Sequence, residues 1–181
     1  KNGIKTYWCP KSGSELPIKI NPKVFNLLLH KNKENTLKRD LSASLNDIGD
    51  DILNVEFHSI LQPRLNPIDS SYIEIINEAI DLINDGKYKG MVMGHQGSNF
   101  CAGANLNLLL ELSQNQQWEA LDYAVKTMQD MTQRIRFCKG PIIATPFQLT
   151  LGGGTEIIQP AAHRIAASET YMGFVEVAVG L

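Results

Sequence analysis

The sequence lacks the features that mark several large classes of protein. Its three cysteines, Cys9, Cys101 and Cys138, form no Cys-x-x-Cys pair, which argues against a disulfide framework and a zinc site. No apolar run approaches the roughly 20 residues that a membrane helix needs. The first residues carry no apolar signal segment. We therefore expect a cytoplasmic protein with no metal and no membrane span.

Signatures of nucleotide and nucleic-acid binding are also missing. No Gly-x-Gly-x-x-Gly follows the first predicted strand, so the chain itself has no NAD fingerprint, and neither a P-loop nor a Gly-x-Ser-x-Gly elbow occurs. The net charge of −2, without a basic stripe, excludes an obvious nucleic-acid partner. The histidines are scattered without metal-ligand spacing: His30, His58, His95 and His163.

The charge that is present is unevenly distributed. Residues 1–45 hold eight Lys, one Arg and only three acids, whereas the remainder is net acidic. We interpret 1–45 as a partly ordered linker; the alternative is a segment near the phosphates of a nucleotide-like ligand. Within it, the apolar run Val24–His30 fits either a strand or a helix. The length fits about one domain, which we assign to 46–181.

Hydrophobic periodicity predicts a strand followed by a helix. Residues 52–57 alternate and indicate the strand. Asn66-Pro67 is typical of a helix start, with Asn as the cap and Pro first in the helix, and Gly86 is placed to end it. The expected buried face of this helix has helical spacing and consists of Ile68, Tyr72, Ile75, Ile76, Ala79, Ile80 and Ile83.

The same alternation continues along the chain. Residues 90–94 predict a buried strand, and 142–145 predict another. Between them lies a second amphipathic helix that should end near Gly140-Pro141, with an apolar face of Trp118, Leu121, Val125, Met128, Met131 and Ile135. Strands alternating with helices predict an α/β protein. The pattern alone does not separate a doubly wound sheet from a spiral of ββα turns.

Two short stretches carry the chemistry. Asn99-Phe100-Cys101-Ala102-Gly103-Ala104-Asn105-Leu106 and Leu151-Gly152-Gly153-Gly154-Thr155-Glu156 each place a small-residue turn after an apolar run. Bare backbone N–H groups in such turns can face a ligand, and two of them on one oxygen form an oxyanion hole. Glu156 stands three residues beyond Gly153, and a second carboxylate, Glu176, follows in the segment 173–181.

This combination resembles the crotonase family, the enoyl-CoA hydratases and isomerases, over residues 46–181. The segments 43–50 and 167–176 look like the hydratase portion of long bifunctional proteins in which a 3-hydroxyacyl-CoA dehydrogenase precedes the hydratase. The resemblance implies an α/β fold, the crotonase-like ββα spiral. It also implies an enoyl-CoA hydratase of fatty-acid β-oxidation.

The resemblance further implies a role for each site residue. The amides of Ala104 and Gly153 would be the oxyanion donors, aimed by turns at Gly103 and Gly152. Glu156 and Glu176 would share the proton transfers around one water. Because both carboxylate positions are filled, the resemblance favours a hydratase over a double-bond isomerase, which commonly keeps one.

Substrate contacts follow by the same resemblance. Arg64 would lie near the phosphates of coenzyme A, and Ala102 would line the substrate site together with Gly103 and Gly152. The substrate would be a coenzyme A thioester, with no cofactor bound by this chain and NAD used only by the dehydrogenase half. Asn105 departs from the aspartate common at this position, where the backbone does the work.

Length is the larger departure from the family pattern. The family continues past the second glutamate with a glycine-rich turn and helices that close the pocket and build homotrimers. We therefore expect an incomplete domain lacking that C-terminal helical region, in which the apolar run Val177–Leu181 would lie inside a larger fold. The alternatives are another crotonase activity (isomerase or acyl-CoA hydrolase) and a catalytically silent, truncated binding domain.

Overall fold

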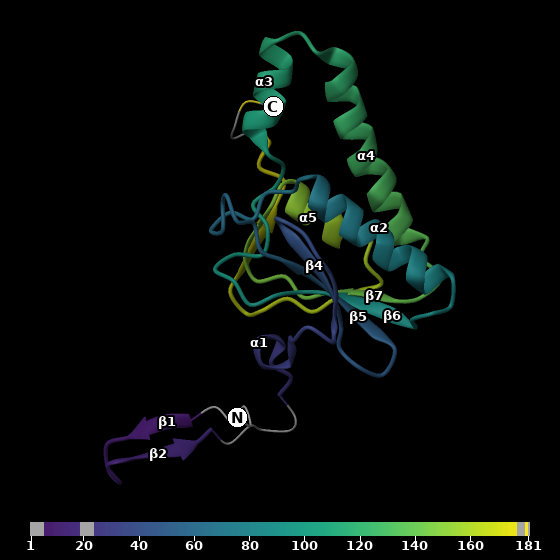
Figure 1. Cartoon of the computed structure of the whole chain (residues 1–181). Helices are drawn as coiled ribbons and strands as arrows, with labels where there is room; N and C mark the ends of the chain where they lie inside the picture. The colour runs from purple at the N-terminus through teal and green to yellow at the C-terminus, as the bar shows by residue number, and fades with distance from the viewer. Residues whose placement is uncertain (1–5, 19–23, 177–179, 181) are drawn as a thin grey trace.

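A six-stranded sheet forms the centre of the computed structural model, which describes residues 6–18, 24–176 and 180 (Figure 1). Antiparallel pairing joins the first three strands of this sheet, and parallel pairing joins the rest. In spatial order they are β3 (Thr36–Arg39), β4 (Ala43–Asp47), β5 (Ile52–Phe57), β6 (Gly90–Met93), β7 (Ile142–Ala144) and β9 (His163–Arg164). A second, parallel sheet pairs β8 (Gln148–Leu151) with β10 (Thr170–Gly173).

The helices follow the predicted alternation with one addition. Helix α2 (Ser70–Asn84) packs on β4 and β5 and against α4 (Trp118–Arg136). Helix α3 (Leu106–Gln114), which the sequence pattern did not predict, precedes α4, and α5 (Gly153–Ile158) follows β8. A separate hairpin near the N-terminus pairs β1 (Thr6–Cys9) with β2 (Ser14–Pro17).

The buried face of α2 is confirmed, but the predicted start of this helix is wrong. All seven of the expected apolar residues, from Ile68 to Ile83, are buried. The cap, however, is Asp69, whose carboxylate accepts the Tyr72 amide at 3.2 Å. Asn66 lies in the preceding turn with φ of 46°, where its side chain accepts the Ser59 amide and donates to the Asn99 carbonyl. The Asn-Pro pair therefore marks a turn joined to the site loops.

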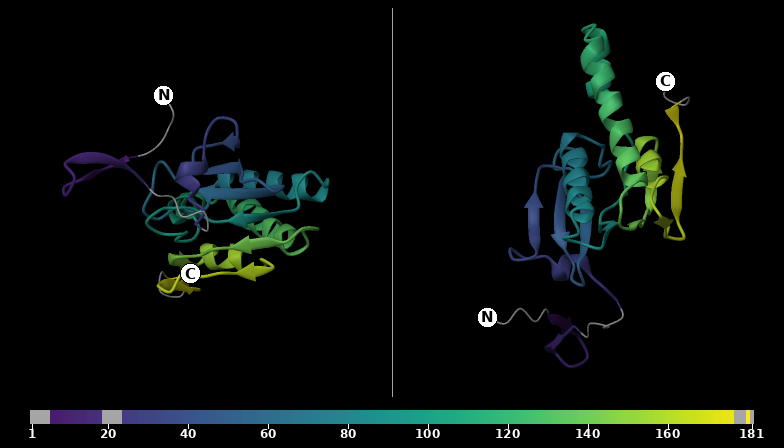
Figure 2. Two further views of the ribbon diagram at one scale, coloured as in Figure 1. Left: turned by 90° about the horizontal axis from the view of Figure 1, so that it is seen from below. Right: turned by 90° about the vertical axis from the view of Figure 1, so that its right-hand side faces the viewer.

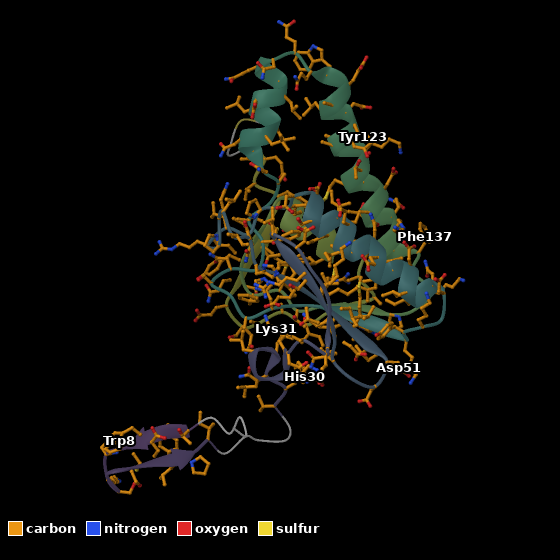
Figure 3. All side chains as sticks on the ribbon, viewed as in Figure 1. Trp8, His30, Lys31, Asp51, Tyr123 and Phe137 are labelled. Atoms are coloured by element: carbon orange, nitrogen blue, oxygen red, sulfur yellow. The ribbon has the colours of Figure 1, made fainter. Side chains whose placement is uncertain are left out.

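Helix α4 is confirmed over its length, but only two of the six expected residues of its apolar face are buried. Met131 and Ile135 are buried near its C-terminal end, whereas Trp118 is 58% exposed. Figures 1 and 2 show why: α3 and the first half of α4 rise together away from the sheet. Tyr123 on α4 and Phe137 directly after its last residue, both labelled in Figure 3, are each 73% exposed. The amphipathic pattern predicted the helix correctly, but not what covers it.

The sheet includes part of the segment expected to be a linker. Strand β3 precedes residue 46 and β4 spans it, so the expected division at 45/46 falls within a strand. The run Val24–His30 contains a short helix, α1 (Leu27–His30). Directly after α1, labelled Lys31 pairs with the buried Glu56 of β5 at 2.7 Å (Figure 3). This pair ties the basic segment to the sheet.

Two expectations, on a membrane span and on the C-terminal apolar run, can be compared only with the described residues. Across residues 6–18 and 24–176, no helix is long and apolar enough to cross a membrane. The run Val177–Leu181 lies outside the described residues except for Gly180. Cys9, Cys101 and Cys138 are all free thiols.

Candidate active site

The two glycine-containing turns lie side by side because their flanking segments pair. The Cys101 amide donates to the Leu149 carbonyl at 3.1 Å, and the Leu151 amide donates to the Cys101 carbonyl at 2.9 Å. Residues 100–104 therefore run along β8 as it approaches Gly152. This pairing brings Gly103 against the start of α5, although about fifty residues separate the turns in the sequence.

The amides of Ala104 and Gly153 meet across this contact. A Cβ built on Gly153 would lie 3.4 Å from the Ala104 nitrogen, and one built on Gly103 would lie 3.6 Å from the Gly153 nitrogen. Within residues 6–18 and 24–176, neither amide donates a hydrogen bond to the protein. The turn thus holds two neighbouring N–H donors that remain available to a ligand.

Glycine is required here by space and by backbone conformation. A Cβ on Gly154 would lie 2.2 Å from the Cys101 carbonyl oxygen, far inside any real contact. Gly152 has φ of 51° and ψ of −122°, and Gly103 has φ of 98°, both in the region that favours glycine. The three glycines let the two backbone segments approach closely, so that the Ala104 and Gly153 nitrogens lie near each other.

Both expected carboxylates lie beside these turns. Glu176 Oε1 is 3.0 Å from the position that a Cβ on Gly152 would take. Glu156 lies in the first turn of α5, exposed on one side to solvent. Partial desolvation raises the pKa of the Glu156 carboxyl, and the nearby charge of Glu176 raises it further. Both causes favour the protonated form of Glu156.

The loop that carries Arg64 is fastened to the same site by Asn99, for which the sequence indicated no role of its own. The Asn99 side chain donates to the Arg64 carbonyl at 2.7 Å and accepts the Leu149 amide at 3.1 Å. Ala102 donates its amide to the Leu65 carbonyl at 2.8 Å. Arg64 itself is exposed, and its guanidinium pairs with no carboxylate among the described residues.

Asn105 has a structural explanation. Its side chain caps α3 by accepting the Leu108 amide, so the residue after Ala104 fixes the start of that helix. An asparagine serves as an N-cap as well as an aspartate does. The departure from the family pattern therefore leaves the Ala104 amide in place.

A cavity of about 670 Å³ opens beside Glu156. It lies between α4, α5 and β10, and its wall mixes apolar and polar side chains, among them Met128, Gln133, Arg136, Met172 and Phe174. Space for a ligand thus adjoins one of the two carboxylates.

Comparison with protein families and curated proteins gives a consistent result. A family described as enoyl-CoA hydratase/isomerase matches residues 61–181. The whole chain is 38% identical over 181 residues to a Bacillus subtilis protein named "Probable 3-hydroxyacyl-CoA dehydrogenase", of which it covers 22%. Over 144 residues, 79% of the chain, it is 30% identical to the fatty acid oxidation complex subunit alpha of Colwellia psychrerythraea, of which it covers 19%. The chain therefore spans about a fifth of the length of these relatives.

Solved structures agree on the fold. An enoyl-CoA hydratase from Thermoplasma volcanium matches with a TM-score of 0.65 and 24% identity, over 78% of this chain and 54% of that one. An enoyl-CoA hydratase from Polaromonas matches with a TM-score of 0.69 and 22% identity, over 77% and 53%. The α/β, crotonase-like fold expected from the resemblance is confirmed.

Proposed function

This chain belongs to the enoyl-CoA hydratase/isomerase family, and from that membership we propose that it adds water to 2-enoyl-CoA thioesters. We further propose that it is the hydratase portion of a 3-hydroxyacyl-CoA dehydrogenase-type protein of fatty-acid β-oxidation. The names of its relatives, of which it covers about a fifth, support this context.

The first requirement of the reaction is stabilisation of an oxygen. When water adds to the carbon at position 3, electron density moves onto the thioester carbonyl and forms an enolate-like oxyanion. The neighbouring amides of Ala104 and Gly153, which donate to no other group among the described residues, supply two fixed donors for it. Donors that are already oriented need no reorganisation as the charge develops. This pair of amides is the observation that carries the proposal.

The second requirement is proton transfer in two directions. One carboxyl takes a proton from the attacking water, whose oxygen bonds to carbon 3, and the other gives a proton to carbon 2. Burial and the neighbouring charge of Glu176 raise the pKa of Glu156, so Glu156 and Glu176 together can supply an acid and a base. The product is a 3-hydroxyacyl-CoA, and the transferred proton returns through the pair before the next turnover.

Substrate binding uses the surroundings of this pair. The cavity beside Glu156 has room for an acyl group, and Arg64 on the loop held by Asn99 offers a cation for the coenzyme A phosphates.

We propose that the chain itself binds no NAD. Calorimetric titration of the chain with NAD should show no saturable heat, and micromolar binding would contradict this part of the proposal.

A direct assay separates this function from its alternatives. The chain in its full natural polypeptide is mixed with crotonyl-CoA or longer 2-enoyl-CoAs, and the 3-hydroxyacyl-CoA product is identified by mass spectrometry. We expect a mass gain of one water. Isomerisation of 3-enoyl-CoA without hydration would indicate an isomerase. Release of free coenzyme A would indicate a hydrolase, and binding without turnover would indicate a silent binding domain.

A further inference from the structure

Thr155 occupies a position between the two halves of the site. It lies in the first turn of α5, between Gly154 and Glu156, and its side chain is buried. Its hydroxyl donates to the Thr150 carbonyl at 2.6 Å, with the Gly173 carbonyl at 3.2 Å as a second acceptor. The same hydroxyl accepts the Gly173 amide at 3.0 Å. One oxygen therefore connects α5, β8 and β10.

The connection falls at the end of the β8–β10 ladder. Gly173 pairs with Leu151 as the last residue of that ladder, and the Gly152 amide donates to the Gly173 carbonyl at 2.9 Å. Beyond Gly173 the chain leaves the sheet and reaches Glu176 three residues later, where Oε1 lies against Gly152. The Thr155 hydroxyl thus hydrogen-bonds to the segment that leads to Glu176. Thr155 is also the residue directly before Glu156 in the sequence.

We propose that Thr155 is a positioning residue that sets the placement of the Glu156 and Glu176 carboxyls relative to each other and to the two amides. This inference rests on the proposed hydratase function. If the hydroxyl is removed, the Gly173 amide loses a partly buried hydrogen bond and the Thr150 carbonyl loses a buried one, so β10 is less firmly held against α5. A site without this hydroxyl keeps every group that would touch substrate, but the distance between the two carboxyls changes.

The test uses three replacements of Thr155 in the full natural polypeptide. Thr155→Val keeps the shape and removes the hydroxyl, Thr155→Ala removes it while leaving room for the chain to fold, and Thr155→Ser retains it. We expect kcat for crotonyl-CoA to fall at least tenfold in the Val and Ala variants with KM within about twofold, and to recover to within about threefold in the Ser variant.

The matched control is Thr170→Val. Thr170 lies at the other end of β10, and its hydroxyl also donates to backbone carbonyls, those of Ala167 at 2.8 Å and Pro146 at 3.2 Å. This variant should leave kcat within about twofold of the parent. An equal loss in Thr170→Val would mean that β10 needs its hydrogen bonds only for folding, and would overturn the positioning role.

A second readout does not depend on turnover. Because the charge of Glu176 contributes to the raised pKa of Glu156, separating the two carboxyls should lower the Glu156 pKa. Carboxyl-carbon NMR titration of Glu156 should therefore show a lower pKa in Thr155→Val or Thr155→Ala than in the parent and in Thr155→Ser. If the parent has no hydratase activity, the proposed function is wrong, and this titration alone then decides whether Thr155 sets the spacing. Unchanged kcat or an unchanged Glu156 pKa in a folded Val or Ala variant would overturn the role of Thr155.

Discussion

The amide side and the carboxylate side of the site are built on different physical principles. On the amide side, Gly103 and Gly152 to Gly154 bring two backbones so close that a single methyl group on Gly154 would overlap the Cys101 carbonyl. On the carboxylate side, Glu156 is a side chain of α5 and Glu176 follows β10, and the Thr155 hydroxyl joins α5 to β10. Changes on the amide side should therefore affect stability first, whereas changes on the carboxylate side should affect chemistry first.

The largest expected effect is on the carboxylate side. Glu156→Gln and Glu176→Gln keep the size of each side chain and remove its proton-transfer function, so each should lower kcat by roughly 10²–10⁴-fold. Binding of a non-reacting coenzyme A thioester and the thermal unfolding midpoint should change little. Parent-like hydration by either variant would remove that carboxyl from the mechanism.

The second prediction concerns the amide side. Gly154→Ala forces a Cβ to within 2.2 Å of the Cys101 oxygen, and the backbones must separate. Overpacking of this kind typically costs about 1–3 kcal/mol of unfolding free energy. The control is Gly173→Ala, because a Cβ there meets nothing within 4 Å and Gly173 has no positive φ. Urea denaturation of both variants measures the difference in unfolding free energy between them. Equal losses of stability would contradict the prediction.

The amide side should also be the more sensitive to acid. His95 donates from Nε2 to the Phe100 carbonyl at 3.0 Å, at the start of the segment that ends in Ala104. Burial lowers the pKa of His95 from its ordinary value of 6.5. The unfolded chain therefore binds the proton more readily, so the stability that neutral His95 contributes is complete above about pH 6.5 and is lost as pH falls toward its lowered pKa.

Comparison of variants isolates this contribution. The unfolding free energy of His95→Gln should depend less on pH between about 7.5 and 5 than that of the parent, by at most about 1.4 kcal/mol per pH unit. His163→Gln, at an exposed position, should follow the parent curve. If all three curves coincide, His95 does not couple the amide side to pH.

The smallest expected effect is a pKa change on the carboxylate side. In Glu176→Gln the pKa of Glu156 should fall because one of its two causes, the neighbouring charge, is removed. The pKa should stay above its ordinary value because desolvation, the larger cause, remains. NMR titration of the Glu156 carboxyl measures the change, and a rise would show that the two groups do not repel.

The same contrast explains what the sequence could predict. The amide side depends on glycine turns of short spacing, so the sequence indicated the turns at Gly103-Ala104 and Gly152-Gly153-Gly154, and the family resemblance implied their roles. The role of Thr155 could not, because a threonine next to a glutamate has the pattern of an ordinary helix residue, and its partner Gly173 lies 18 residues away. Asn99 is similar, since its bonds to Arg64 and Leu149 span 35 and 50 residues.

Secondary structure shows the same limit. Seven apolar positions predicted the buried face of α2, and all seven are buried because the sheet and α4 cover α2 and Ile68 packs near Gly153. In α4 an equally regular pattern predicted the helix but not its exposure, because periodicity reports a face and not its partner. The start of α2 was misplaced because the side chain of Asn66 bonds to Ser59 and Asn99 instead of capping the helix.

Hydration of crotonyl-CoA by the Glu156→Gln/Glu176→Gln double variant, compared with each single variant, tests directly whether the two carboxyls act together. If the two carboxyls act as one proton-sharing unit beside the Ala104 and Gly153 amides, the second substitution adds little to the first. We predict that kcat of the double variant lies within about threefold of the slower single variant. If the decreases in kcat of the two single variants multiply in the double variant, the two carboxyls act independently and do not form one unit.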